Sequence, residues 1–161
     1  MALEILEVHH TALNMPAAKV DAMGLFYHDV MGMDTDASRW EIKGAPGFFM
    51  DTKDDRQLHL LGRDGVSQWA QGPEQDPAER HVAFAVRDIA IAESELKRLG
   101  VVYFSLNNAG APDLRQLFFK DPAGNLLEIH QIGRCRCKAS NRAFSDAKVA
   151  AGATAALPPK G

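Results

Sequence analysis

The chain has 161 residues, of which 46% are hydrophobic and 24% charged, and its formal net charge is −3 at pH 7. This length suits one compact domain, and the composition is ordinary for a globular protein. No apolar run approaches the roughly 20 residues needed to cross a bilayer, and the start MALEILEVHH lacks the basic residues of a signal peptide. We therefore expect a cytoplasmic protein with no membrane partner.

The cysteines and the distribution of charge exclude two further classes. Cys135 and Cys137 are the only cysteines, and two are too few for a disulfide-stapled fold. Residues 132–161 carry six Lys/Arg against one Asp, so the preceding body is more acidic than the net charge suggests. An acidic body argues against nucleic acid as the main partner.

The first half of the chain predicts a strand, a helix and three further strands. A strand near 5–13 precedes a helix from Ala17 to Met31, which ends before Gly32. Strands near 38–42, 47–51 and 57–61 follow. Residues 63–78 are rich in Gly, Pro, Gln and Asp, and we interpret them as a linker between two halves.

The second half predicts the same series. A strand near 80–86 leads to a helix that begins at Asp88, a good N-cap, and ends at Leu99 with Gly100 at its C-cap. Strands near 101–105, 114–120 and 125–131 follow, the last two joined by a Pro/Gly turn at 121–125. From residue 133 the chain is basic and then rich in Ala, Gly and Pro, so we expect 133–161 to be a disordered tail.

Three segments recur in order at nearly one offset, which indicates an internal repeat. HTAL at 10 recurs as HVAF at 81, FFMD at 48 as FFKD at 118, and LHL at 58 as LEI at 127. The offsets are 71, 70 and 69 residues. The repeat predicts two tandem βαβββ modules, 5–62 and 79–131, within one domain that spans residues 1–132.

Each predicted module offers one polar candidate on its first strand and one on its last. These are His10 and His59 in the first module, and His81 and Glu128 in the second. Side chains alternate along a strand, so His9 is expected to point away from the face that His10 shares with small neighbours. If the modules pack about a pseudo-twofold axis, the four candidates converge at the centre of the sheet.

Two imidazoles and one carboxylate suit Fe²⁺, Mn²⁺, Ni²⁺, Co²⁺ or Zn²⁺, and leave coordination positions for a substrate. A single strand histidine is more often a hydrogen-bonded core or surface residue, so the hypothesis depends on the whole set. His130 either orients Glu128 or is a surface residue at a strand end. Cys135 and Cys137 would need further ligands that the tail lacks, so we expect no metal there.

Five segments carry a resemblance to a known family, over residues 5–131: VHHTALNM, LFYHDVMGM, GAPGFFMDTKDDRQLHLLG, RHVAFAVRDI and FFKDPAGNLLEIHQ. The chain resembles the vicinal oxygen chelate superfamily, which includes glyoxalase I, extradiol dioxygenases and bleomycin-binding proteins. The resemblance implies an α+β fold, in which paired βαβββ modules form an open, cup-shaped mixed sheet, and a homodimer. It also implies one divalent metal per site, with Fe²⁺ favoured, on His10, His81 and Glu128, and a variable fourth position at His59.

The resemblance further implies a small-molecule substrate that chelates the metal through adjacent oxygens. Glyoxalase I commonly has Glu where His59 stands and Arg where Asn14 stands, whereas extradiol dioxygenases have a matching His/His/carboxylate set but usually a Tyr near Phe118. Our leading hypothesis is dioxygenase-type ring or C–C cleavage, with His59 as a ligand or as a catalytic acid/base. A glyoxalase-like lyase or isomerase is the alternative. A metal-free binding or resistance protein is the third, although such proteins usually lack the ligands.

Overall fold

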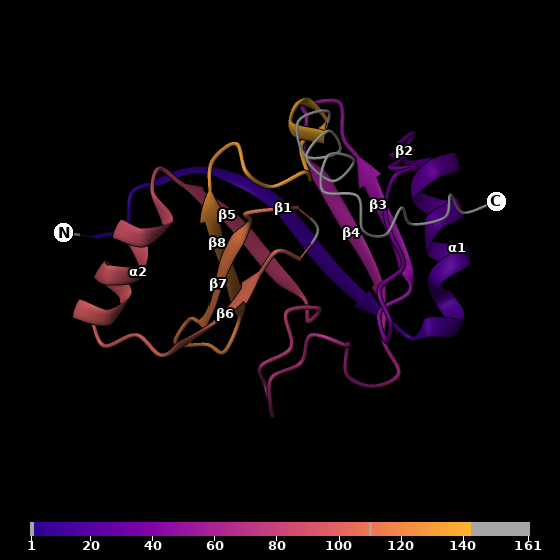
Figure 1. Cartoon of the computed structure of the whole chain (residues 1–161). Helices are drawn as coiled ribbons and strands as arrows, with labels where there is room; N and C mark the ends of the chain where they lie inside the picture. The colour runs from indigo at the N-terminus through magenta and orange to yellow at the C-terminus, as the bar shows by residue number, and fades with distance from the viewer. Residues whose placement is uncertain (1, 110, 143–161) are drawn as a thin grey trace.

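The computed structural model describes residues 2–109 and 111–142. Within them, eight strands form one mixed sheet in the order β2-β3-β4-β1-β5-β8-β7-β6 (Figure 1). The elements run β1 (Ile5–Met15), η1 (Ala17–Lys19), α1 (Val20–Leu25), η2 (Phe26–Val30), β2 (Asp34–Thr35), β3 (Gly47–Asp51), β4 (Gln57–Gly62), β5 (His81–Val86), α2 (Ile89–Arg98), β6 (Tyr103–Asn107), β7 (Arg115–Lys120) and β8 (Leu126–Gln131).

Strand pairing shows the predicted repeat directly. The first strand of each module pairs in parallel with the last strand of that module, β1 with β4 and β5 with β8. The antiparallel pair β1–β5 then joins the two modules at the middle of the sheet. The predicted α+β fold of paired βαβββ modules is confirmed, and both first strands lie at the centre, where the candidate ligands were expected.

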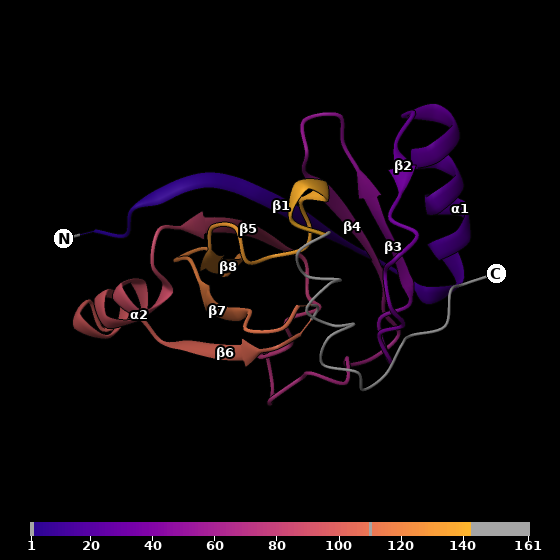
Figure 2. The same ribbon diagram turned by 45° about the horizontal axis from the view of Figure 1, so that its top comes forward.

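The helices lie at opposite ends of the molecule, α1 beside the β2–β4 half and α2 beside the other (Figures 1 and 2). Asp88 caps α2 as predicted, because its Oδ1 accepts hydrogen bonds from the backbone N–H groups of Ala90 (2.8 Å) and Ile91 (3.0 Å). Gly100 follows with a φ of 69°, a conformation that glycine adopts without strain. Among the described residues, no helix is long and apolar enough to cross a membrane.

The strand predicted near 38–42 is wrong, because this segment is a loop and β2 is a two-residue strand at Asp34–Thr35 instead. Asp36 turns the chain here: its Oδ1 accepts a hydrogen bond from the backbone N–H of Ser38 at 3.0 Å. The alternating apolar residues that suggested a strand have another role. Ile42 is buried in the core and Trp40 packs against that core. Both side chains line the same cavity, so the alternation of apolar residues comes from a cavity wall and not from a strand.

The structure differs from the expected disordered tail over residues 133–142, which pack on the body of the protein; residues 143–161 lie outside the described part of the chain. We call residues 134–142 the strap. The strap is basic and the body is acidic, so opposite charges hold the strap in place. Its ion pairs are Arg136–Asp36 (2.9 Å), Lys138–Glu7 (2.7 Å), Arg142–Asp36 (3.1 Å) and Arg142–Asp51 (2.8 Å).

Candidate metal centre

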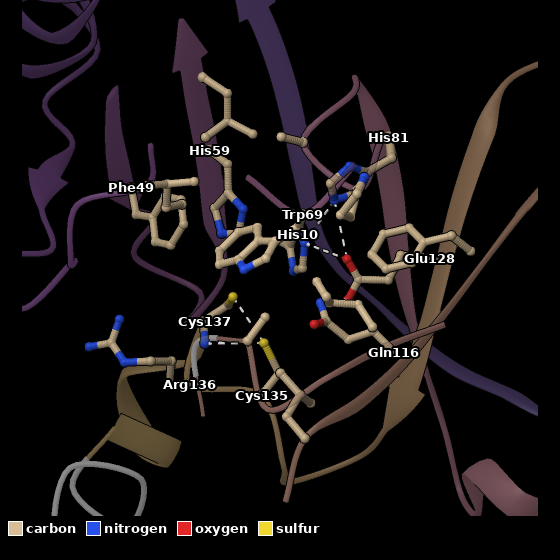
Figure 3. A pocket seen from close by; sticks show the side chains of 18 of the residues that line it. His10, Phe49, His59, Trp69, His81, Gln116, Glu128, Cys135, Arg136 and Cys137 are labelled. Atoms are coloured by element: carbon tan, nitrogen blue, oxygen red, sulfur yellow. Dashed lines mark hydrogen bonds and ion pairs between the residues drawn. The ribbon is translucent and has the colours of Figure 1, made fainter. Parts of the chain in front are cut away.

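Strand register brings the candidate ligands together at the centre of the sheet. His10 on β1 is opposite Ala83 on β5, and Ala83 is opposite Glu128 on β8. His81 lies two residues before Ala83, on the same face of β5. Ala83 is fully buried and ends at its methyl group, so the longer side chains of His10 and Glu128 meet above it. Figure 3 shows His10, His81 and Glu128 converging from the three strands.

The three donor atoms form a nearly equilateral triangle. His10 Nε2 lies 3.2 Å from His81 Nε2 and 3.4 Å from Glu128 Oε2, and His81 Nε2 lies 3.2 Å from Glu128 Oε2. Ligands about 2.0–2.1 Å from one tetrahedral ion are roughly 3.3 Å apart, so these distances fit one face of a coordination shell. All three residues are at least nine-tenths buried. The donor set and its spacing therefore fit a divalent metal ion.

Neighbouring groups orient the triangle. His81 Nδ1 donates to the Glu79 carbonyl oxygen at 2.6 Å, which leaves Nε2 as the lone-pair nitrogen. Gln116 Nε2 and His130 Nδ1 donate to Glu128 Oε1 at 2.9 and 3.0 Å, which leaves Oε2 facing the histidines. His130 is fully buried, so of its two alternatives the structure favours the one in which it orients Glu128.

The charges inside the triangle are strongly coupled. Burial alone would raise the pKa of Glu128, but His10 beside it and hydrogen bonds from neighbouring histidines hold that pKa well below its usual range. Burial alone would lower the pKa of His10, but Glu128 and Cys135 raise it to about 9. Without a metal, His10 thus carries a proton beside the Glu128 carboxylate. A metal cation at the triangle would replace that proton.

His59 lies beside the triangle. Its ring stacks on that of His10, with centroids 4.1 Å apart and planes 22° apart, and on that of Phe49, with centroids 3.7 Å apart. Its donor atoms are not part of the cluster of mutually close ligand atoms that His10, His81 and Glu128 form among the described residues. Burial, followed by the charges on His10 and His81, keeps the pKa of His59 well below its usual value. His59 is therefore a neutral ring.

Gln57 fixes which nitrogen of His59 carries the proton. Gln57 Nε2 donates to Asp51 Oδ1 at 2.8 Å and to Asp36 Oδ2 at 3.2 Å, so the carbonyl end of the amide faces His59. His59 Nε2 lies 3.2 Å from that oxygen and must donate to it. Nδ1 of His59 is then left as the basic nitrogen.

A cavity opens onto the triangle. It encloses about 540 Å³ of space between the atoms, which includes space open to solvent. Its walls are mainly apolar and aromatic. Its polar and sulfur-bearing groups are those of the triangle and of His59, Gln116, Cys135, Arg136 and Cys137. The larger apolar residues that line it are Trp40, Ile42, Phe49, Leu61, Trp69, Leu106, Leu114 and Phe118.

The structure adds His9, Cys135 and Cys137 to the site, none of which the sequence predicted there. The prediction that His9 points away from His10 is wrong: Val8 pairs with Phe84 and His10 with Ala83, so β1 has one extra residue at His9. Such a bulge interrupts the alternation of side chains, and the Nδ1 atoms of His9 and His10 are 3.3 Å apart. Sequence alternation gives no sign of a bulge.

Comparisons with known proteins agree with the fold and with the resemblance. The model of the Glyoxalase/Bleomycin resistance protein/Dioxygenase superfamily matches residues 7–129. Glyoxylase I 4 of Arabidopsis thaliana is 28% identical over 81 residues, which are 50% of this chain and 44% of that protein. The chain thus matches less than half the length of this curated relative.

Two solved structures illustrate the likeness of fold. Methylmalonyl-CoA epimerase from Mycobacterium tuberculosis has a TM-score of 0.59 at 18% identity, covering 81% of this chain and 89% of that one. Homoprotocatechuate 2,3-dioxygenase from Brevibacterium fuscum, in complex with 3,4-dihydroxyphenylacetate, has a TM-score of 0.55 at 19% identity, covering 81% of this chain and 37% of that one. At these identities the likeness shows the fold alone.

Proposed function

We propose that this chain, which belongs to the Glyoxalase/Bleomycin resistance protein/Dioxygenase superfamily, is a metal-dependent enzyme acting on a small substrate with two adjacent oxygens. The observation that carries the proposal is the triangle of His10, His81 and Glu128 donors, 3.2–3.4 Å apart at one wall of the cavity. When bound, the metal would polarise the substrate oxygens as a Lewis acid and, as Fe²⁺, would supply oxygen chemistry. The protein's part is to hold the ligands, exclude water and move protons.

The leading reaction is ring or C–C bond cleavage by dioxygen. Two histidines and one carboxylate on one face form the ligand set typical of non-haem Fe²⁺ oxygenases. Flat side chains on the cavity wall, including Phe49, Trp69 and Phe118, suit a planar aromatic substrate such as a catechol. The Brevibacterium fuscum dioxygenase, which shares the fold, is solved with a catechol compound.

His59 is the proposed proton-transfer group. Its ring is neutral, buried and stacked on His10, and Gln57 leaves Nδ1 basic. A base so close to the triangle can accept a proton from a hydroxyl group of the substrate as that substrate chelates the metal. The expectation that His59 is instead a fourth ligand stays a prediction, which metal analysis of a His59 variant checks.

A glyoxalase-like isomerase or lyase is the second candidate, and the same buried base favours it. Moving a proton between two carbon atoms needs a base beside a polarised carbonyl, and His59 beside the triangle meets that need. The curated relative named Glyoxylase I 4 is similar over half of this chain. This reaction consumes no dioxygen, which separates it experimentally from the first.

The test is metal analysis of protein purified without oxygen, followed by oxygen-uptake assays with catechols. Iron at one equivalent with catechol-dependent uptake supports the dioxygenase. Nickel or zinc that is lost in His81→Ala, together with no uptake, favours the isomerase or lyase. His81→Ala and Glu128→Gln should lose the metal, whereas the exposed His28→Ala should keep it. Protein without stoichiometric metal would contradict the enzyme proposal and favour a binding protein. The expected homodimer is a separate proposal, checked by light scattering.

A further inference from the structure

A second cluster of donor atoms lies next to the triangle. It joins His9 and His10 of β1 to Cys135 and Cys137 of the strap, and its four ligand atoms all lie within 4.8 Å of one another. All four residues are at least nine-tenths buried. Figure 3 shows both sulfur atoms on the side of the cavity below His10. Residues about 125 positions apart in the sequence thus present nitrogen and sulfur donors to one point.

The spacing of the nitrogens already suits a tetrahedral ion. The Nδ1 atoms of His9 and His10 are 3.3 Å apart, about the edge expected for two nitrogens bound to Zn²⁺. The two sulfur atoms are 2.9 Å apart, and both cysteines are free. Two zinc-bound thiolates are about 3.8 Å apart, so the sulfurs would separate by about 0.9 Å, which small side-chain rotations can supply.

His9 lacks the partners that a buried imidazole normally has. Its Nε2 is buried and, within the described residues, has no hydrogen-bond partner, and its Nδ1 faces only another ring nitrogen, that of His10. Nδ1 is the nitrogen that faces the cluster, so an ion bound there would replace the contact between the two Nδ1 atoms and would leave Nε2 as it is. Cys135 Sγ accepts a hydrogen bond from the backbone N–H of Cys137 at 3.5 Å, and the two cysteines also pack on Ala111 and Leu114.

We infer that His9, Cys135 and Cys137, with Nδ1 of His10 at the fourth position, form a second metal site for a thiophilic ion such as Zn²⁺. Two thiolates neutralise the charge of the ion, so the ion with both thiolates and a neutral His9 has no net charge and is compatible with burial. The site differs from the triangle in chemistry, because thiolates select softer ions than carboxylates do. It does not rest on the proposed function, since its ligands other than His10 are absent from the triangle.

The two sites share the ring of His10. Nε2 of His10 faces His81 and Glu128, whereas Nδ1 faces His9. A neutral imidazole has one lone pair, so His10 can bind both ions only after losing its ring proton. The other three ligands therefore define the second site. An ion on them would fasten the strap to β1 and fix the wall of the cavity that Cys135 and Cys137 line.

The test is titration of the metal-free, reduced full-length chain with Co²⁺ under anaerobic conditions. Wild-type protein should bind two equivalents and develop the near-ultraviolet absorption of a thiolate-to-cobalt charge transfer. His81→Ala should lose one equivalent but keep this absorption. The double variant Cys135→Ser/Cys137→Ser should lose the absorption and keep the other equivalent. His9→Ala should weaken binding at the sulfur site at least tenfold, with His28→Ala as the matched control.

Three outcomes would overturn the inference. The first is no charge-transfer absorption from wild-type protein at two equivalents, and the second is retention of that absorption in the cysteine variant. The third is its loss in His81→Ala, which would show that the sulfurs bind the ion of the triangle. A measurement on wild-type protein guards against misfolded variants: Zn²⁺ should slow alkylation of the two thiols at least tenfold, and a chelator should reverse this. Unchanged alkylation contradicts the site. The oxygen-uptake assay is independent of all these results.

Discussion

Asp36 is the buried carboxylate on which the strap is anchored. It pairs with Arg136 at 2.9 Å and Arg142 at 3.1 Å, and its side chain is 2% exposed. Burial alone would raise the pKa of Asp36, but hydrogen bonds from Ser38 and the Arg136 guanidinium lower it from 3.8 to about 2. This difference corresponds to about 2 kcal/mol of stability at neutral pH.

Asp36→Asn should remove that contribution and take the Asp36 charge away from Arg136 and Arg142, although Arg142 keeps its ion pair with Asp51. We expect the free energy of unfolding at pH 7 to fall by about 2 kcal/mol and Tm to fall by about 4–8 °C. Because the folded-state pKa is the lower one, the contribution is present above pH 3.8 and is lost as the pH falls through about 2. The gap between variant and wild type should therefore be constant from pH 7 to 5 and narrow below pH 4.

The assay is urea unfolding at several pH values, with Asp34→Asn as the matched control. Asp34 pairs with Lys53 at 3.1 Å, but both side chains are more than two-thirds exposed, so its loss should change the stability by less than about 0.5 kcal/mol. Trypsin should also cut the strap faster in Asp36→Asn. Equal urea midpoints for wild type and Asp36→Asn at pH 7, or a gap that persists undiminished at pH 3, would refute the reasoning.

Three further predictions concern the triangle. Gln116→Ala removes a hydrogen bond to Glu128 and should weaken metal binding about 10–100-fold, measured by competition with a chelator. The circular dichroism spectrum should stay unchanged. An unaltered metal affinity would contradict the orienting role of Gln116. His59→Phe keeps a stacked ring but removes the base. The metal content should therefore stay at the wild-type level while kcat falls about 10²–10⁴-fold. Loss of the metal would show that His59 is a ligand instead. Because the pKa of His10 without metal is about 9, binding of an ion at the triangle should release about one proton at pH 7.5. Calorimetry in buffers of different ionisation enthalpy measures this proton release. Below that pKa the apparent metal affinity should fall about tenfold for each unit by which the pH is lowered. A pH-independent affinity would show that the metal does not displace a proton from His10.

The sequence by itself determined the repeat and, apart from the bulge at His9, the faces of the central strands. An offset of about 70 residues relates His10 to His81, and the period of two along a strand places the larger ligands beside small residues such as Ala83. These are local properties, since a strand's alternation and a helix cap such as Asp88 depend on neighbours in the chain. For this reason His10, His59, His81 and Glu128 could be named as candidates before the fold was known, whereas the choice of His10, His81 and Glu128 among them came from the family resemblance.

Only the tertiary structure decided what surrounds them. The bulge at His9 arises from the register between β1 and β5, which no pattern within β1 records. The strap packs because its basic residues meet carboxylates about 100 positions away, such as Asp36, although its composition alone suggests disorder. Cys135 and Cys137 gain nearby histidines only when the chain returns to β1. Long-range charge pairing and strand register are properties of the assembled sheet, so local sequence reasoning could not place these residues at the site.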